Sequence, residues 1–459
     1  MAGGHRQRIL TIPTGLPFLK TLAAALCDGR LTEHFRHDPN DPLSLAKVSI
    51  FLPTRRAARV LRSEFVDLLG GRSAILPVIR PLGETDDDSG YFEETLPDTA
   101  DLAQPLANTA RLLELARLIL AWRNKLPQIV RDIHSDSPLV APASPADAIW
   151  LARNLAELID SLETEDRDWS ELASLNAEEH ALWWQLTAEF LRIASAFWPA
   201  RLEELGKSSA ARNRNAILRA EAQRIAATQH PGPVIVAGST GSVPATAELI
   251  AAVASLPQGV IVLPGLDLSM PEEHWQLVAP ETVAGERPDP TTRSHPQYGL
   301  SLLLKRLHAT RHDVETVAEA AESMQMRAQI LSRALAPAEA TSGWGSWHKT
   351  LAPDAIAGAF ADVALIEAAN EREEATAIAI ALRLALEKPG RNGGESQAAL
   401  ITPDRNLARR VTAELSRFGI TADDSAGTPL SAMPQGTLLQ LLLEATLRPG
   451  DPVSIVSLL

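Results

Sequence analysis

The chain of 459 residues has one cysteine, seven lysines and no apolar run of about 18 residues. A lone cysteine, Cys27, excludes an internal disulfide and any cysteine-rich zinc or iron–sulfur site within these residues. The absence of a long apolar run leaves no candidate for a membrane-spanning helix, and the first residues lack the apolar stretch of a signal peptide. We therefore expect a reduced, cytoplasmic protein with no membrane partner.

Positive charge is also scarce. The 57 Asp and Glu residues outnumber the 43 Lys and Arg residues, which gives a formal net charge of -14 at pH 7. The field of the whole molecule repels a polyanion, so any contact with nucleic acid has to be local. Because 45% of the residues are hydrophobic and 22% are charged, the chain can bury several cores, and about two or three globular units are expected.

Short apolar strands followed at once by helices recur along the chain. The pattern is present at 9–26, 47–69 and 234–263, and it returns after strands predicted at 363–366 and 399–401. Strands that lead into helices through tight turns are typical of parallel sheets. The sequence therefore predicts an α/β fold with two parallel-sheet units.

A helical segment interrupts the first unit. Residues 102–229 show helical spacing and no convincing strand, and six of the nine tryptophans lie there, which we interpret as core anchors rather than base-stacking platforms. The stretch 83–101 has eight acidic residues and no basic one, which is typical of a solvated boundary loop. The first α/β unit is predicted in two parts, 1–101 and 231–340, with the helical insertion 102–230 between them. The second unit is predicted at 341–459. The sequence stops inside an apolar helix, so we expect a longer natural protein, with the second unit incomplete.

The residues of a phosphate-binding P-loop are missing. Such a loop needs glycines, a lysine for the phosphate oxygens and a Ser or Thr for Mg²⁺, directly after a strand. The tripeptide Gly206-Lys207-Ser208 follows a helix instead and has Arg201 in the place of the first glycine. We interpret it as a helix end followed by a linker.

Two other strand ends keep only a remnant of a nucleotide loop. Thr14 and Gly15 follow the first strand without a lysine, and Gly238, Ser239 and Thr240 follow a strand where a motor ATPase carries carboxylates for magnesium and water. A Gly/Ser loop at a helix N-terminus can hold an anion, so weak phosphate binding stays open, whereas hydrolysis is not expected. No catalytic or metal-ligating residue is assigned, because the histidines and carboxylates do not group at ligand spacing and no hydrolase motif is present.

Arginines gather at the start of the helix after the second strand. Arg55, Arg59 and Arg62 are spaced at i, i+4 and i+7, and Arg56 flanks them. A stripe at the carboxyl edge of a parallel sheet is well placed to contact a nucleic-acid backbone. A solvated helix face explains the same spacing equally well.

The segments IFLPTRRAARVLRSEF and ALITPDRNLARRVTAEL echo one another. Each has a strand, a Pro/Thr pair and a helix bearing arginines, which in the second segment include Arg405 and Arg409. Two copies of one α/β unit would produce this similarity.

Ten blocks in order resemble the alphaproteobacterial type of the AddB family of double-strand break repair subunits. They include TIPTGLPFLKTLAAAL, IFLPTRRAARVLRSEF, AILPVIRPLGETDDD, PVIVAGSTGSVPATAELI, GVIVLPGLD, HPQYGLSLLLKRL, RALAPAEATSGW, ANEREEATAIAIALR, ALITPDRNLARRV and DDSAGTPL, and span essentially all of the chain. The resemblance implies two RecA-like units of superfamily 1 helicase type, 1A split by a 1B-like insertion and then 2A. It also implies a C-terminal nuclease domain with an iron–sulfur cluster and Mg²⁺ chemistry beyond residue 459.

The resemblance also implies partners and site residues. The partners would be the AddA motor-nuclease subunit, single-stranded DNA and duplex DNA ends, and the helicase-like part would guide the strand and recognise the Chi sequence. Thr14 and Gly15 resemble a degenerate nucleotide loop that lacks the lysine some relatives retain. The segment Thr54, Arg55 and Arg56 resembles the one that contacts single-stranded DNA, and Thr402 to Arg405 resembles its counterpart in the second unit.

Three hypotheses follow. The first is a helicase-like subunit without motor activity and without a resident cofactor in these residues, which guides single-stranded DNA in an AddAB-type helicase-nuclease for recombinational repair. The second is an atypical helicase that hydrolyses ATP. The third is a structural module that docks a partner and makes no direct contact with DNA.

Overall fold

The computed structural model describes residues 7–82, 102–125, 144–169, 181–279, 290–388, 396–425 and 427–458. They belong to two compact units, Met1–Ala361 and Asp362–Leu459. The division between the units falls later than the boundary predicted after residue 340. The acidic stretch 83–101 lies outside the described residues.

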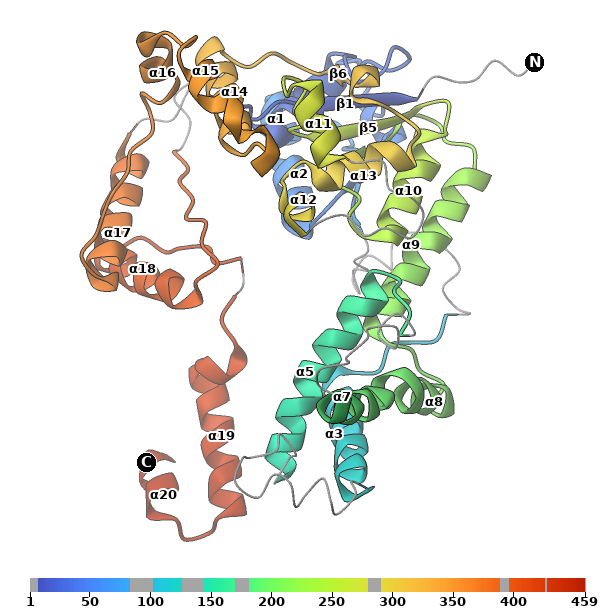
Figure 1. The fold of residues 1–459 in the computed structure, drawn as a ribbon, viewed down its shortest axis with the longest axis vertical. Helices are drawn as coiled ribbons and strands as arrows, with labels where there is room; N and C mark the ends of the chain where they lie inside the picture. Colours follow the sequence, from blue (N-terminus) through green and yellow to red (C-terminus); the bar gives the residue numbers. More distant parts are fainter. Residues whose placement is uncertain are drawn as a thin grey trace. The chain divides into compact units, whose positions relative to one another are not determined.

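The first unit is built on one parallel sheet of six strands in the order β3-β2-β4-β5-β1-β6. Strands β1, β5 and β6 are labelled in Figure 1. The strands are β1 (Arg8–Ile12), β2 (Ser49–Leu52), β3 (Val78–Pro81), β4 (Val234–Ala237), β5 (Gly259–Pro264) and β6 (Glu315–Thr316). Strands from both sides of the helical segment therefore share one sheet, because β4 and β5 insert between β2 and β1. The predicted parallel α/β fold is confirmed for this unit.

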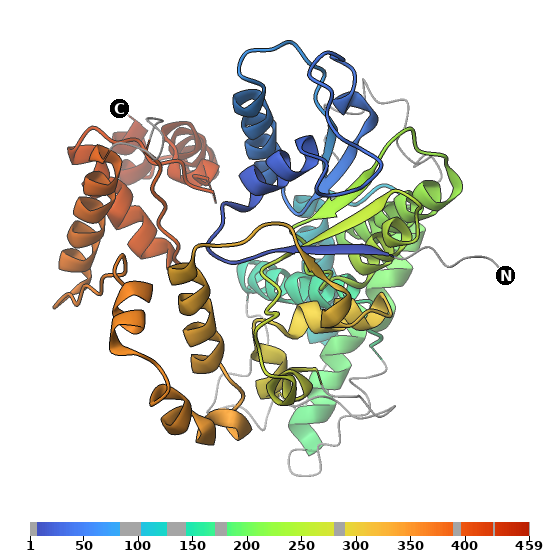
Figure 2. The ribbon, with the colours of Figure 1, turned by 90° about the horizontal axis from the view of Figure 1, so that it is seen from above.

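Helices cover both faces of the sheet (Figure 2). One face packs against α1 (Phe18–Cys27) and α2 (Arg55–Leu69), and the other packs against α9 (Ala210–Ala227), α10 (Pro244–Ala254) and α13 (Tyr298–Arg306). Successive residues of a strand point to opposite faces, so Ile50 joins the core under α1 and α2 while its neighbour Phe51 joins the core under α10. This burial on both sides explains why the strands read as continuous apolar runs.

The predicted insertion is mainly helical in its described residues, which form no strand beyond an isolated bridge between Pro105 and Ser208. Its elements are α3 (Asn108–Lys125), α5 (Pro145–Thr164), α7 (Ala181–Arg192), the π-helical turn Ile193–Phe197, α8 (Trp198–Glu204) and α9. Trp198 is 1% exposed in the core of this segment, as expected of an anchor, but Trp150 is 58% exposed and the core prediction for it is wrong. The later part of α9 packs on the sheet through Leu218 and Ile225, so this helix connects the two cores.

The rest of the first unit contains α11 (Glu272–Val278), α12 (Pro290–Ser294), α14 (Glu322–Ala334), α15 (Trp344–His348) and α16 (Pro353–Ala359). Residues 341–347, whose glycines and serines suggest a linker, lie in a 3₁₀ turn and α15, and the indole of Trp344 donates a hydrogen bond to the carbonyl of Arg333. None of the residues of α14 is buried.

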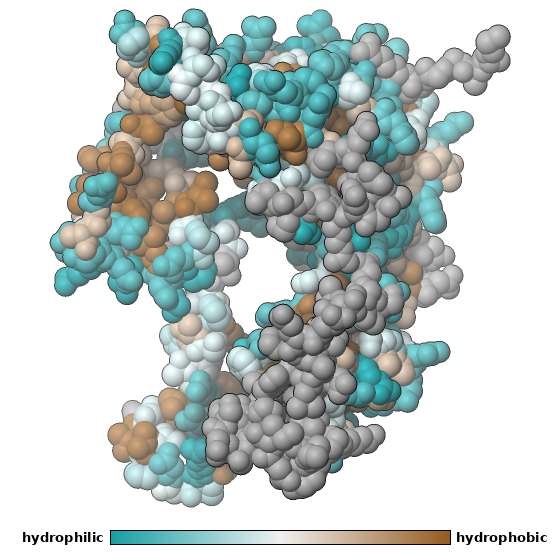
Figure 3. Space-filling model, in the orientation of Figure 1, coloured by the Kyte–Doolittle hydropathy of each residue, from teal (hydrophilic) through white to brown (hydrophobic). Residues whose placement is uncertain are grey.

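The second unit has helices but no sheet among its described residues. Its helices are α17 (Glu371–Glu387), α18 (Arg405–Arg417), α19 (Pro434–Leu447) and α20 (Pro452–Leu458). The strands predicted at 363–366 and 399–401 do not form; both segments have no assigned strand, and Leu365 and Ile401 are 86% and 95% exposed. The second parallel sheet is therefore not observed, because neither segment has a hydrogen-bonded neighbouring strand. Figure 3 shows apolar surface on this part of the molecule.

The echo between the two segments extends to structure. Residue numbers that differ by 350 have the same role: Thr54 caps α2 and Asp404 caps α18 through their side-chain oxygens. The equivalent buried pairs are Leu61 with Val411 and Phe65 with Leu415. The two helices therefore bury the same face, but a second copy of the α/β unit is not confirmed, because the second segment forms no strand.

Phe65 tests the core under α2. Phe65 is fully buried while the adjacent Val66 is 56% exposed. Truncation of a buried aromatic side chain leaves a cavity, so Phe65→Ala is expected to lower the free energy of unfolding by about 3 to 5 kcal/mol. Val66→Ala, the matched control, is expected to change it by about 0.5 kcal/mol or less. Urea unfolding of both variants measures this, and equal effects would contradict the burial of α2 described above.

Candidate functional site

Loops that follow parallel strands meet at the carboxyl edge of the sheet, where ligands of open α/β folds bind. The ring of Phe18, at the start of α1, lies against Gly238 after β4: a Cβ built on Gly238 would be 3.3 Å from Cε1 of Phe18. The same Cβ would be 3.6 Å from Cδ of Pro53, which follows β2. Three loops that are distant in sequence therefore converge here.

The turn after β1 has the backbone of a loop, but the side chain of Met324 occupies the space over Gly15. Gly15 has a φ of +92°, and a Cβ at this position would be 3.2 Å from Cβ of Met324 on α14. Pro17, the residue before α1, has no N–H to donate and makes no side-chain cap. Side chains of Phe18 and Met324 thus lie against the glycines of both predicted nucleotide-loop remnants, where a P-loop would leave space for the phosphates.

The remnant after β4 is held by local contacts. The hydroxyl of Ser239 accepts a hydrogen bond from the N–H of Gly241 at 3.2 Å. Thr240 lies against α13, since a Cβ on Gly299 would be 3.6 Å from Cβ of Thr240. The loop leads into α10 without a carboxylate or a side-chain cap.

The arginines predicted to bind DNA in the first unit lie on an exposed face. Thr54 accepts a hydrogen bond from the N–H of Ala57 at 3.1 Å, so its side chain serves to cap α2. Arg55, Arg56 and Arg59 are exposed on the first two turns of the helix. Sequence spacing alone placed them on this face, and the structure agrees.

Each of the corresponding residues of the second unit, Thr402, Arg405 and Arg409, bonds to a nearby residue. Thr402 accepts a hydrogen bond from the N–H of Asp404 at 3.0 Å. The guanidinium of Arg405 donates to both carboxylate oxygens of Asp424, at 3.0 and 2.6 Å, and this pairing raises the pKa of Arg405. Arg409 donates to the side chain of Asn406 at 3.1 Å.

The basic stretch from Arg201 to Arg224 is largely ion-paired. Arg201 pairs with Glu114 and Glu204, and Arg219 pairs with Asp166 and Glu248. The Gly206-Lys207-Ser208 tripeptide follows α8, and Gly206 has the left-handed φ of +60° common after a helix end. Its interpretation as a helix end is confirmed.

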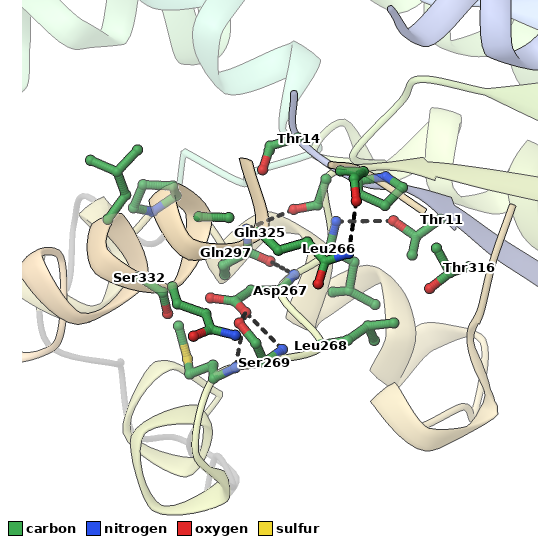
Figure 4. Close-up of a pocket in the computed structure, with 18 of the residues that line it drawn as sticks. Thr11, Thr14, Leu266, Asp267, Leu268, Ser269, Gln297, Thr316, Gln325 and Ser332 are labelled. Atoms are coloured by element: carbon green, nitrogen blue, oxygen red, sulfur yellow. Dashed lines mark hydrogen bonds between the residues drawn. The ribbon is translucent and has the colours of Figure 1, made fainter. Parts of the chain in front are cut away.

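A cavity of about 600 Å³ lies beside these loops, and the sequence analysis missed it (Figure 4). Its walls come from the ends of β1 and β6, the loop 265–270 after β5, residues 295–297 and α14. The helices that follow β1 and β5 pack on opposite faces of the sheet, so the cavity is at a topological switch point. The walls are far apart in sequence and share no motif.

Side-chain contacts fix the loop after β5. The amide of Gln297 donates to the carbonyl of Gly265 at 3.1 Å and accepts from the N–H of Asp267 at 3.0 Å. The hydroxyl of Thr11 accepts from the N–H of Leu266 at 3.1 Å. Arg311, which is 6% exposed, donates to the carbonyls of Asp267 and Met270.

No family model and no curated protein sequence matches this chain. Among the described residues, no group of three or more His, Cys, Asp or Glu side chains is arranged to hold a metal ion. The helices described also include none with the length and hydropathy needed to cross a membrane.

His295, at the cavity wall, generates a prediction on pH dependence. Burial lowers the pKa of His295, and its Nδ1 accepts a hydrogen bond from the N–H of Gln297. The unfolded chain therefore takes up a proton near the ordinary pKa of about 6.5 before the folded chain does, and stability falls as the pH drops below that value. In His295→Asn the side-chain oxygen can replace the acceptor without titrating. Melting temperatures at pH 7.5 and 5.5 are expected to differ less in this variant than in the wild type, and an unchanged difference would refute the prediction.

Proposed function

We propose that this chain is a helicase-like subunit without motor activity, which guides single-stranded DNA within an AddAB-type helicase-nuclease for double-strand break repair. The observation that carries the proposal is the sheet order. In RecA-like ATPases one strand separates the phosphate-loop strand from the strand with the magnesium carboxylates, and here β5 lies between β1 and β4. The parallel sheet is thus consistent with a RecA-like α/β fold, while the loops after β1 and β4 lack the lysine and carboxylates of a motor.

The packing at those loops supports the absence of hydrolysis. A triphosphate needs inward-facing N–H groups and a cation at the start of α1. That position instead has Pro17, the aromatic ring of Phe18 and, over Gly15, the side chain of Met324. No observation on the described residues favours the alternative of an ATP-hydrolysing helicase.

The exposed arginines of α2 support contact with a DNA backbone. They follow β2 at the carboxyl edge of the sheet, so a strand passing over this edge would meet Arg55, Arg56 and Arg59 in succession. Because the whole chain carries a net charge of -14, such contact would depend on this local group of charges.

A partner-docking module without DNA contact is a second candidate. The observation that favours it is the pairing of Arg405 with Asp424, which neutralises one of the arginines assigned to DNA in the second unit. The ion pairs of Arg201 and Arg219 likewise reduce the positive field of the helical insertion.

Charge removal on α2 separates the two candidates. Each phosphate neutralised on a single strand contributes about 0.7 to the slope of log K against log salt. The triple variant Arg55→Gln/Arg56→Gln/Arg59→Gln is therefore expected to bind an oligo-dT strand more weakly and to lower the slope by about 2. Fluorescence anisotropy with the full chain, across a series of KCl concentrations, measures both quantities.

The matched control replaces the same three residues by lysine, which keeps the charge and is expected to keep most of the slope. An unchanged slope in the glutamine variant, or no binding by the wild type, would reject the assignment of these arginines and favour the docking module.

Nucleotide binding provides a separate test. Because side chains fill the loop after β1, the melting temperature is expected to stay the same in millimolar Mg-ATP, whereas a ligand at 100 times its Kd would stabilise the fold by about 2.7 kcal/mol. Thermal unfolding with Mg-ATP, and with MgCl₂ alone as the control, measures this. Saturable stabilisation or steady ATP turnover would restore the helicase alternative.

A further inference from the structure

The cavity at the ends of β1, β5 and β6 borders the nucleotide-loop remnant after β1, because Thr14 is one of its lining residues. It has a volume of about 600 Å³, which is within the usual range for ligand sites. The loop 265–270 that forms one wall is fixed by Gln297, Thr11 and Arg311, as described above. Its geometry is therefore set before any ligand arrives.

The charge of the lining excludes an anion. Among the described residues that line the cavity, the carboxylates are Asp267 and Glu319, and no lysine or arginine faces it. Oδ1 of Asp267 accepts hydrogen bonds from the N–H groups of Ser269 and Met270, so this carboxylate is held in place (Figure 4). A phosphate would meet two negative charges without a counter-charge, whereas a cation would be attracted.

The rim of the cavity is apolar and accessible. Leu268 on the loop is 40% exposed, and Leu331 on α14 and Leu335 directly after its end are 48% and 53% exposed. Half-exposed leucines around carboxylates match a ligand that has apolar groups on either side of a positive charge. The Leu331–Leu335 spacing would fit a polypeptide laid along α14.

We propose that this cavity receives an arginine or lysine side chain, flanked by apolar residues, from a partner polypeptide. The positive group is received between Asp267 and Glu319, and the flanking apolar residues cover the rim leucines. The proposal is independent of the DNA contact assigned to α2.

A matched set of short peptides tests it. The probes are acetyl-Leu-Arg-Leu-amide, the same peptide with the neutral arginine analogue citrulline, and the same peptide with glutamate. Saturation-transfer NMR with the full chain gives the Kd of each. The arginine peptide is expected to bind up to about fivefold more tightly than the citrulline peptide, because an exposed ion pair contributes up to about 1 kcal/mol. The glutamate peptide is expected to show no saturable binding.

Variants connect this preference to the cavity. Glu319→Gln is expected to abolish most of the preference for arginine over citrulline, whereas Glu322→Gln, the same charge change on α14 outside the lining, is expected to retain it. Leu331→Ser/Leu335→Ser is expected to weaken both peptides to a similar degree. Equal binding of the arginine and citrulline peptides, preference for glutamate, or no effect of Glu319→Gln would overturn the proposal. Salt-dependent DNA binding that survives such a result would leave the proposed function standing.

Discussion

A parallel sheet has to be covered on both faces, and this constraint organises the first unit. Ile50 and Phe51 are neighbours in sequence but belong to different cores, one under α1 and α2 and the other under α10. Because the strands have apolar side chains on both faces of the sheet, the chain has to supply two layers of helices. The return of the chain from the helical insertion through α9, β4 and α10 supplies the second layer.

The same constraint shows what distinguishes the second unit. Leu400, the equivalent of Ile50, packs against the core of α17 and α18. Ile401, the equivalent of Phe51, is 95% exposed. Among the described residues, segment 399–401 is therefore covered by helices on the side of Leu400 only, and its other side is exposed to solvent. The two similar segments share the helix and its cap but not the strand.

The carboxyl edge of the first unit combines the backbone of tight loops with bulky side chains packed against their glycines. Gly15 and Gly238 keep the conformations of tight loops, but Met324 and Phe18 lie against them. The consequence is a rigid junction of β1, β2 and β4, with the exposed arginines of α2 directly beyond it. A strand-guiding role needs such a fixed edge and does not need the rearrangement that accompanies hydrolysis.

Short-range sequence patterns correctly predicted those elements that depend mainly on neighbouring residues. The strands β1, β2, β4 and β5, the capped helix α2 and the end of α8 at Gly206 follow from apolar runs, caps and glycine positions. The strands expected near Leu365 and Ile401 failed because a strand requires a hydrogen-bonded neighbour, and propensity does not provide one. Trp150 was expected in a core but is exposed. The prediction was wrong because the size and apolar character of a side chain do not determine which face of α5 it occupies.

The cavity was unpredictable for a related reason. Its walls combine Thr11 with Gln297 and α14, which lie almost 300 residues or more later in the chain, and the side-chain contacts that organise it have no sequence signature. The arginine stripe of α2 was visible in the sequence, but the engagement of Arg405 by Asp424 depends on a contact across 19 residues.

The exposed apolar side chains of the second unit affect how copies of the chain interact with one another. Residues such as Leu365, Ile401 and Leu447 offer apolar surface that favours self-association, whereas the charge of -14 makes copies repel. Salt screens the repulsion and leaves the apolar attraction in place. The colloidal balance of the protein is therefore set by ionic strength, with clustering favoured as salt rises.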